Sequence, residues 1–577
     1  MSNCWRCFFS LPTQGSDNFE SIQFNYHICV SSIKINSSRV FMKSLFPEKY
    51  HRYIYIFALI ILVIGLPLSK FLMSLSQIIL ACNWLLEGNI KNKCIRFWNN
   101  KTALVVSSVL LLHFIGFLHT SDLDYAFKDI RIKAPLFILP LIISTSKPLS
   151  KKVFDSILQF LVAAIISGTI ISTLILNDII HRPVIDIRDI SIFISHIRFA
   201  LLICVAVFIS SYFVLKSQVV FGKVVWSVII LWLVFFLIVM ESLTGLMALS
   251  AATIGLIVYA AQKSQKKLLK YGSLFLLSGS IALSVFYVNS IANENKKTVI
   301  IDFNKLDKFT SQGNLYEHDI QSKVRENGHL VWSYYSIIEL KEAWKKRSAV
   351  KIDSSDLKGN TVYFTLFRFL TSKGLRKDAD AVFALTESEI KAVERGVTNV
   401  NYQDISSLRG RIYETLWEID LYSKTGQLNG HSLTQRFEYW KTAVGIIQNN
   451  LFLGVGTGDV PIAFEQEYIK KNSSLNKLRR LRAHNQYLSI AVAFGIVGLL
   501  WFLVSLAIPF FNKKTGFNYL YITFFIIAII SFFTEDTLET QAGVTFFAFL
   551  NSYFLFAKES EAAASEGWAD VKRERPI

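Results

Sequence analysis

The sequence contains little charge for its size. Only 18% of its 577 residues are charged, whereas 52% are hydrophobic and 14% are aromatic. In a soluble globular protein of this length about a quarter of the residues would be charged. Several uncharged windows reach about twenty residues, the length of a helix that spans the hydrocarbon core of a bilayer. The composition therefore excludes an ordinary soluble protein and predicts an integral membrane protein.

The sequence is also poor in cysteine, and its six cysteines suggest no disulfide framework. The long polar stretch after residue 290 contains none, so it must be held together by packing alone. Cys4 and Cys7 lack the second pair of ligands that a structural zinc site needs, so we expect no zinc there. The six are Cys4, Cys7, Cys29, Cys82, Cys94 and Cys204.

Motifs for several kinds of chemistry are missing as well. The sequence has no carboxylate–histidine cluster suited to a divalent metal, no ATP-binding motif and no serine hydrolase elbow. The net charge of +18 comes from basic residues scattered among short loops, without an aromatic–basic nucleic-acid module. We therefore expect no nucleic-acid partner, no metal and no other cofactor.

The apolar segments have the length of membrane-spanning helices. Twelve are predicted, nine before the polar stretch and three after it, and the fourth is the weakest because it is short and contains Pro135 and Pro140. The expected fold is an all-α polytopic membrane protein with a large, mostly helical extramembrane loop. The predicted spans are residues 53–69, 71–87, 102–119, 134–145, 153–177, 191–215, 224–240, 243–261, 269–290, 486–511, 519–533 and 541–557.

Charges in the short loops alternate in sign along the chain. Loops predicted on the same side of the membrane as the N-terminus are basic, as at Lys91, Lys93 and Arg96. Loops predicted on the opposite side are acidic, as at Asp122 and Asp124. Under the positive-inside rule both termini are cytoplasmic and the polar loop faces outward. In a bacterium this predicts a multi-pass inner-membrane protein with a periplasmic loop.

These patterns divide the chain into five parts. Residues 1–41 are aperiodic and rich in Ser and Asn, which predicts a disordered leader or a mis-set start codon. An N-terminal membrane bundle of about nine helices follows over 42–290, and then the large loop over 291–485. About three C-terminal helices occupy 486–557, and 558–577 form a cytoplasmic tail.

Arg198 is the first candidate for chemistry. With a span that begins near Ser191, it would lie roughly 10 Å below the outer end, at about 1.5 Å per residue. An arginine there is costly unless it faces the bundle interior or a water-filled cavity, and its guanidinium suits phosphate oxygens. The alternative is a side chain that reaches the interface or forms a structural ion pair.

Two further clusters lie near the end of the loop. One is Arg436-Phe-Glu-Tyr-Trp440, followed by Leu453-Gly-Val-Gly-Thr-Gly-Asp459. Its glycines could form a turn whose N–H groups bind an anion, although a plain turn fits equally well because no strand, βαβ unit or P-loop lysine accompanies them. The other is Arg479-Arg-Leu-Arg482-Ala-His484-Asn-Gln486. Its bases suit an anionic headgroup or a lipid-linked phosphate.

His484 could take a proton from a sugar hydroxyl, because an imidazole titrates near neutrality. A lone histidine is, however, more often structural than catalytic. Glu535, Asp536, Glu539 and Gln541 lie in the last outer loop and should share the face of His484, where they could orient ligand hydroxyls.

Together these motifs resemble the O-antigen ligase/polymerase superfamily, and Thr534-Glu-Asp-Thr-Leu-Glu-Thr-Gln-Ala-Gly-Val544 is similar to the form found in Bacteroidetes members. The resemblance covers roughly residues 42–556 and is most specific over 436–499. It rests on Arg198, Arg436-Phe-Glu-Tyr-Trp440, Leu453-Gly-Val-Gly-Thr-Gly-Asp459, Arg482-Ala-His-Asn-Gln-Tyr-Leu488 and Phe494-Gly-Ile-Val-Gly498.

The resemblance implies a glycosyltransferase-C-like bundle that transfers a glycan from undecaprenyl diphosphate to an acceptor, commonly lipid A–core, without metal or ATP. His484 would be the general base, and Arg198 and Arg436 would bind the carrier diphosphate. Many relatives have a further arginine where this chain reads Glu241-Ser-Leu-Thr-Gly245, so that contact is missing or comes from Arg482. The supporting candidates are His196, Gly456, Asp459, Asn485, Glu535 and Gln541.

Several alternatives stay open at this point. Within the family, the chain could be a polymerase that joins carrier-linked repeats or a protein O-oligosaccharyltransferase. Outside it, a transporter for the same lipids would bind near the midplane between repeated halves. The candidates here gather near the outer face and no repeat relates the halves, so transport is less favoured, as is a non-catalytic assembly partner.

Overall fold

The fold is taken from a computed structural model that describes residues 47–558, except for 183, 185, 296–297, 320, 323, 404–407, 427, 429–431 and 512–517. The leader predicted over 1–41 and nearly all of the tail predicted over 558–577 lie outside the described residues. The expected class is confirmed: the chain is an all-α polytopic membrane protein, and among the residues just given the strands form a single antiparallel pair of two residues each.

A bundle of apolar helices forms the membrane part of the molecule, and each of the twelve predicted spans coincides with one helix. Its large core joins helices from both ends of the chain, because α22 packs against α7, and α21 packs against α9 and α11. The helices are α2 (Glu48–Leu68), α3 (Lys70–Leu86), α4 (Ile90–Asn99), α5 (Lys101–Phe117), α6 (Leu123–Lys133), α7 (Pro135–Thr145), α8 (Lys151–Leu176), α9 (His196–Lys216), α10 (Val220–Val239), α11 (Leu243–Lys263), α12 (Lys267–Asn295), α20 (Gln486–Phe511), α21 (Tyr519–Thr534) and α22 (Gln541–Phe556).

Not every predicted span has the length of a membrane crossing. Within the described ranges, seven helices are long and apolar enough, or eight if α3 and α4, which bend by 112° at their break, count as one span. The helices α5, α21 and α22 are apolar but have only 16 or 17 residues. At about 1.5 Å per residue such a helix is about 25 Å long, so hydropathy located these segments without fixing how deeply they cross.

A separate lobe lies at the start of the long polar loop. It has its own apolar core, which includes Leu340, Trp344, Leu366 and Phe369 and draws on residues 331–397. The lobe contains η2 (Phe303–Lys305), β1 (Arg325–Glu326), β2 (His329–Leu330), α13 (Ile337–Arg347), α14 (Val362–Ser372), α15 (Ala379–Phe383), α16 (Glu387–Glu394) and η3 (Val400–Tyr402).

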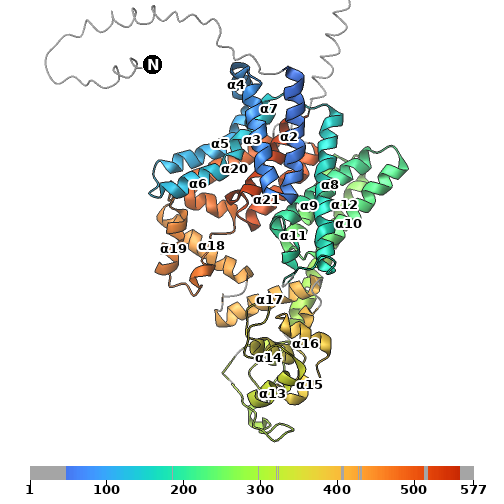
Figure 1. The fold of residues 1–577 in the computed structure, drawn as a ribbon, viewed down its shortest axis with the longest axis vertical. Coiled ribbons are helices and arrows are strands. Elements are labelled where there is room, and N and C mark those ends of the chain that lie inside the picture. The colour runs from blue at the N-terminus through green and yellow to red at the C-terminus, as the bar shows by residue number, and fades with distance from the viewer. Residues whose placement is uncertain are drawn as a thin grey trace, which may run out of the picture.

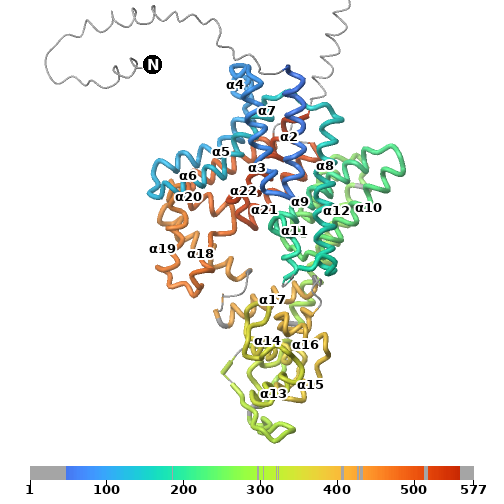
Figure 2. Tube along the Cα trace, in the orientation of Figure 1, coloured from blue at the N-terminus to red at the C-terminus, as the bar shows by residue number. Residues whose placement is uncertain are grey.

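The rest of the loop returns to the membrane bundle. Tyr439, Ala443, Phe464 and Tyr468 belong to the membrane core, so α18 and α19 pack on the bundle rather than on the lobe. In Figures 1 and 2 the lobe lies at the end of the molecule opposite α4, with α17 between the lobe and the bundle, and α18 and α19 near α20. These elements are α17 (Leu408–Thr425), α18 (Ser432–Asn449), α19 (Val460–Lys470) and η4 (Lys477–Arg479).

Candidate functional site

Two short loops meet at one end of the last helices. One precedes α20 and carries His484, and the other joins α21 to α22 and contains η5 (Thr537–Glu539). Asp536 clamps the two together, since its carboxylate accepts the backbone N–H of His484 at 3.0 Å and that of Asn485 at 2.8 Å, and the hydroxyl of Ser489 at 2.7 Å. These bonds hold His484 in the left-handed region at φ 47°, which is uncommon outside glycine.

The His484 ring is oriented by a carboxylate and an aromatic ring. Its Nδ1 lies 3.3 Å from a carboxylate oxygen of Glu535, and the Tyr439 ring lies 5.6 Å away between centroids. Burial lowers the pKa of His484, but the hydrogen bond and negative charge of Glu535 outweigh it, so the pKa is raised above its ordinary value. With Nδ1 directed at Glu535 and the side chain 32% exposed, Nε2 is the nitrogen that can serve a ligand.

Glu535 links His484 to Arg436 and lies within the electrostatic reach of Arg198. A guanidinium nitrogen of Arg436 lies 2.5 Å from its other carboxylate oxygen. Burial raises the pKa of Glu535, but the hydrogen bond to His484 and the charges of Arg436, His484 and Arg198 together lower it below its ordinary value. His484 and Arg436 thus contact one carboxylate although they are far apart in the sequence, and the positive charge of Arg198 acts on the same carboxylate without a hydrogen bond or ion pair to it.

Arg198 lies closer to the start of its helix, α9, than the sequence predicts. The chain forms η1 (Ile187–Ile190) and an irregular segment before α9, which begins at His196 rather than near Ser191. Arg198 is therefore in the first turn of α9. Its Nε is buried and has no hydrogen-bond partner among the described residues. A buried donor of this kind is available to an anion.

The glycine-rich segment 453–459 does not present its N–H groups to an anion. Val455 and Gly456 donate to the carbonyls of Val492 and Ala493 in α20, each at 2.9 Å, and Gly458 donates to the Thr120 hydroxyl at 2.9 Å. These donors are consumed within the protein. The segment is a packed turn against α20 and the α5–α6 connection, which corresponds to the plain-turn alternative for the motif.

Asp459 also acts inside the fold. Its carboxylate accepts the backbone N–H groups of Ser121, at 3.0 and 2.9 Å, and of Asp122, at 2.9 Å, together with the Ser121 hydroxyl. Burial raises its pKa, but these hydrogen bonds outweigh it, so the pKa is lowered. The structure therefore places Gly456 and Asp459 as supports beneath the site rather than beside His484.

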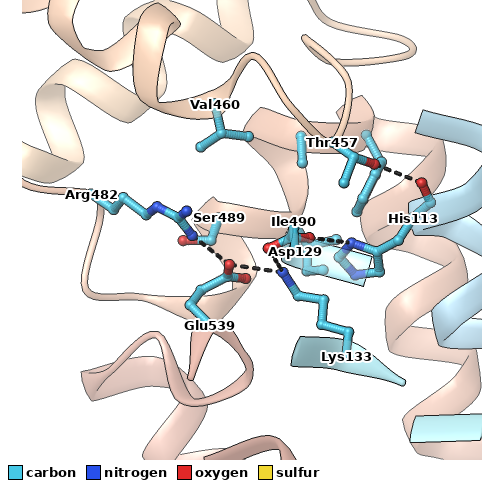
Figure 3. Close-up of a pocket in the computed structure, with 11 residues that line it drawn as sticks. His113, Asp129, Lys133, Thr457, Val460, Arg482, Ser489, Ile490 and Glu539 are labelled. Atoms are coloured by element: carbon cyan, nitrogen blue, oxygen red, sulfur yellow. Dashed lines mark hydrogen bonds and ion pairs between the residues drawn. The ribbon is translucent and has the colours of Figure 1, made fainter. Parts of the chain in front are cut away.

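Arg482 belongs to an ion network with Glu539, Lys133 and Asp129 (Figure 3). It forms an ion pair with Glu539 and lies over the ring of Tyr125, 5.3 Å from its centroid. Lys133 bridges Glu539 at 2.8 Å and Asp129 at 2.6 Å. Arg482 is thus paired with Glu539, whereas Arg436 is paired with Glu535, so the two arginines belong to different ion pairs.

The remaining candidates have different surroundings. His196 lines a cavity that also reaches Arg436 and Glu241. Asn485 donates to the carbonyl of Phe533 at 3.0 Å, and Gln541 donates to Ser74 at 2.6 Å, so both act inside the scaffold. Within the described ranges, no three His, Cys, Asp or Glu side chains gather closely enough to hold a metal ion.

Sequence reasoning missed two sets of residues. The network partners Lys133 and Asp129 lie in α6, an amphipathic segment that we interpreted only as an acidic outer loop. Lys358 and Arg395 come from the lobe and line the same cavity as His196. No motif marks any of the four, because their positions depend on helix packing between distant parts of the chain.

A family model matches part of the chain. Residues 379–503 match the family model described as O-antigen ligase. This segment contains Arg436, Gly456, Asp459, Arg482 and His484, and the match confirms the resemblance to that superfamily. It supports a membrane enzyme of ligase or polymerase type. A search of curated proteins found no match.

Proposed function

We propose that the protein is a metal-independent membrane glycosyltransferase that moves a glycan from undecaprenyl diphosphate to an acceptor hydroxyl, such as one on lipid A–core. The observation that carries the proposal is that His484 and Arg436 both contact Glu535, while Arg198, whose charge acts on the same carboxylate, keeps a buried Nε without a hydrogen-bond partner among the described residues. A base and two cations at one place are what this transfer requires. The match to the O-antigen ligase family model supports the same reaction class.

In the proposed reaction, Nε2 of neutral His484 removes the proton of the acceptor hydroxyl. The acceptor oxygen then bonds to the anomeric carbon of the glycan, and the bond from that carbon to the diphosphate oxygen breaks. The diphosphate leaves with the electron pair, and Arg436 and Arg198 stabilise its charge. Glu535 holds the ring through Nδ1 and balances the imidazolium that forms.

The proposal places the acceptor on the outer side of the inner membrane, where the His484 loop opens beyond the ends of the helices. A polymerase or a protein O-oligosaccharyltransferase would use the same base and cations with a different acceptor. A transporter of the same lipids would need neither an oriented base nor its carboxylate partner. The pairing of His484 with Glu535 therefore favours transfer over transport.

The test is glycan transfer by the purified protein with a His484→Asn substitution. Asparagine tolerates the left-handed backbone of His484 but cannot act as a base, so turnover should fall about 100- to 10,000-fold while the fold is kept. His181→Asn, which changes an exposed histidine away from the site, should transfer normally.

The outcome of that assay also separates the family alternatives. Transfer onto lipid A–core indicates a ligase, a longer carrier-linked chain indicates a polymerase, and a glycosylated protein indicates an oligosaccharyltransferase. Unchanged turnover in a well-folded His484→Asn protein would rule out the general-base role.

A further inference from the structure

A cavity of about 340 Å³ lies between the membrane bundle and the lobe. Its walls come from the α8–α9 connection, the α10–α11 turn, the lobe, α17 and α18, and Arg436 lines one part of it. Cavities of this size commonly hold small molecules. Since Arg436 is the proposed diphosphate contact, the part of the substrate that extends from the diphosphate toward the lobe would enter this space.

Most charges on the cavity wall are already neutralised by neighbours. Arg188 forms two hydrogen bonds with the carboxylate of Asp186, at 2.8 and 2.6 Å. Arg411 forms an ion pair with Glu414, and Arg436 is paired with Glu535. These pairs contribute little net charge, so the excess charge of the cavity depends on the side chains that remain.

The lobe supplies the cations that remain. Lys358 and Arg395 line the cavity, and neither side chain has a hydrogen bond or ion pair with any other described residue. The remaining acid on the wall, Glu241, takes part in an interaction of its own. Among the described residues, the two lobe cations therefore have no ion-pair partner of their own; the charge of Lys358 acts on Asp186, which is already bonded to Arg188.

Two buried donors on the same side are also unsatisfied. Within the described ranges, Nε of Arg395 and the hydroxyl of Tyr402 are shielded from solvent and have no hydrogen-bond partner. A buried polar group without a partner is unfavourable, and most such groups in folded proteins are bonded. A ligand with acceptor oxygens would satisfy both.

We propose that this cavity binds a negatively charged sugar of the glycan substrate. Lys358 and Arg395 contact its carboxylate or phosphate oxygens, and Tyr402 donates a hydrogen bond to it. The subsite rests on the proposed function and deepens it, because it selects acidic glycans, and it uses other side chains than Arg436, which lines the same cavity, and Arg198. Binding at this subsite can be measured without transfer.

The first test is binding of trigalacturonate to the full-length protein in detergent, with neutral maltotriose for comparison. Lys358→Gln/Arg395→Gln keeps part of each aliphatic stem and should weaken trigalacturonate binding at least about 10-fold, because bonds to charged groups are lost. Tyr402→Phe should weaken it about 3-fold without lowering the melting temperature, since its hydroxyl has no partner to lose among the described residues.

A matched control removes the same charge from the lobe outside the cavity. Lys345→Gln/Lys391→Gln changes two exposed lysines of α13 and α16 and should bind trigalacturonate as the wild type does. If both double variants weaken trigalacturonate binding equally, the overall positive charge of the lobe and not the cavity causes the binding, which contradicts the proposal. Unchanged binding in Lys358→Gln/Arg395→Gln would overturn the proposal outright.

Transfer assays identify which substrate carries the acidic sugar. If only a donor with a uronate next to the diphosphate loses turnover in the Lys358/Arg395 variant, the subsite serves the donor, and if only an acidic acceptor does, it serves the acceptor. Equal loss with neutral donor and acceptor would mean that these cations bind the diphosphate, which contradicts the proposal. A wild type that binds trigalacturonate but transfers nothing would instead contradict the proposed function.

Discussion

At the scale of single residues, the His484 loop shows how a strained backbone is held. Asp536 accepts three hydrogen bonds from the loop and the start of α20, and Glu535 fixes the imidazole. The adjacent carboxylates thus have separate roles: Asp536 binds the main chain of the loop, and Glu535 binds the imidazole ring. A left-handed residue costs free energy, which suggests that the position of this ring matters.

Glu535→Gln should alter the pH dependence of transfer. A general base acts only when neutral, so activity declines as the pH falls through the pKa of His484, which Glu535 holds above its ordinary value. Without that negative charge the pKa of His484 falls, and the acidic limb of the pH–rate profile should move to lower pH. Turnover at the optimum should fall at least about 10-fold, because the amide can still accept the Nδ1–H but no longer supplies the negative charge that stabilises the imidazolium.

The measurement is kcat against pH for both proteins. Glu465→Gln is a suitable control, since that glutamate forms an ion pair with Arg480 away from His484. An acidic limb at the same pH in the wild type and Glu535→Gln would show that Glu535 does not set the pKa of the base.

At this scale the sequence predicted His484, Arg198, Arg436 and Glu535, because short motifs mark them. It could not show that Arg482 faces Glu539 instead of the cavity. The two arginines of the Arg480-Leu-Arg482 segment differ only in which neighbour each can reach, and that is decided by the path of the loop. The lobe cations had no motif at all.

At the scale of elements, the glycine-rich segment and a break in α20 complement one another. Gly495 has φ 63° and ψ −164° inside α20, so the helical hydrogen bonds are interrupted there. The carbonyls of Val492 and Ala493 instead accept the N–H groups of Val455 and Gly456. The glycine-rich turn therefore supplies hydrogen-bond donors to two carbonyls of the interrupted helix within the membrane bundle, where carbonyls without a partner are costly.

Gly495→Ala should destabilise the protein by about 2–5 kcal/mol, because an alanine at this backbone conformation is strained and overpacks its surroundings. Its Cβ would lie 2.3 Å from the backbone carbon and oxygen of Phe452. Thermal unfolding in detergent measures the effect.

Gly279→Ala is the matched control for this substitution. That glycine lies in α12 with nothing within 4 Å of the added Cβ. The melting temperature of the Gly279→Ala protein should therefore equal or exceed that of the wild type. Equal melting temperatures for Gly495→Ala and the wild type would contradict the account of the break.

The glycines were visible in the sequence, and their two interpretations were an anion site and a plain turn. Local pattern could not decide between them. The decision depends on carbonyls of a helix that begins thirty residues later, and these become available only because that helix breaks. Hydropathy alone cannot show such a break, since Gly495 lies within a continuous apolar run.

At the scale of the whole molecule, the lobe and α4 lie at opposite ends of the bundle (Figure 1). This arrangement agrees with the loop charges, because α4 carries Lys91, Lys93 and Arg96. Hydropathy located all twelve helices, yet it could not divide the polar loop into a lobe with its own core and helices that return to the bundle. The glycosyltransferase-C-like arrangement stays a prediction.

Cysteine accessibility should show which side the lobe occupies. In spheroplasts, a protein whose single cysteine is an exposed Lys391→Cys in α16 should react with a membrane-impermeant maleimide. A protein whose single cysteine is the exposed native Cys94 of α4 should react only after permeabilisation. The reverse pattern would place the lobe in the cytoplasm and remove the proposed periplasmic site.

The sparse packing of α12 has a consequence for the site. Only 6% of its most apolar window is buried by protein, although this helix leads directly into the lobe and packs on α17. Most of its surface therefore faces hydrocarbon, and α11 and α17 are the helices that hold it in place. Lipid chains then become part of the scaffold, and we expect a bilayer of different acyl-chain length to shift α12 and, with it, the lobe.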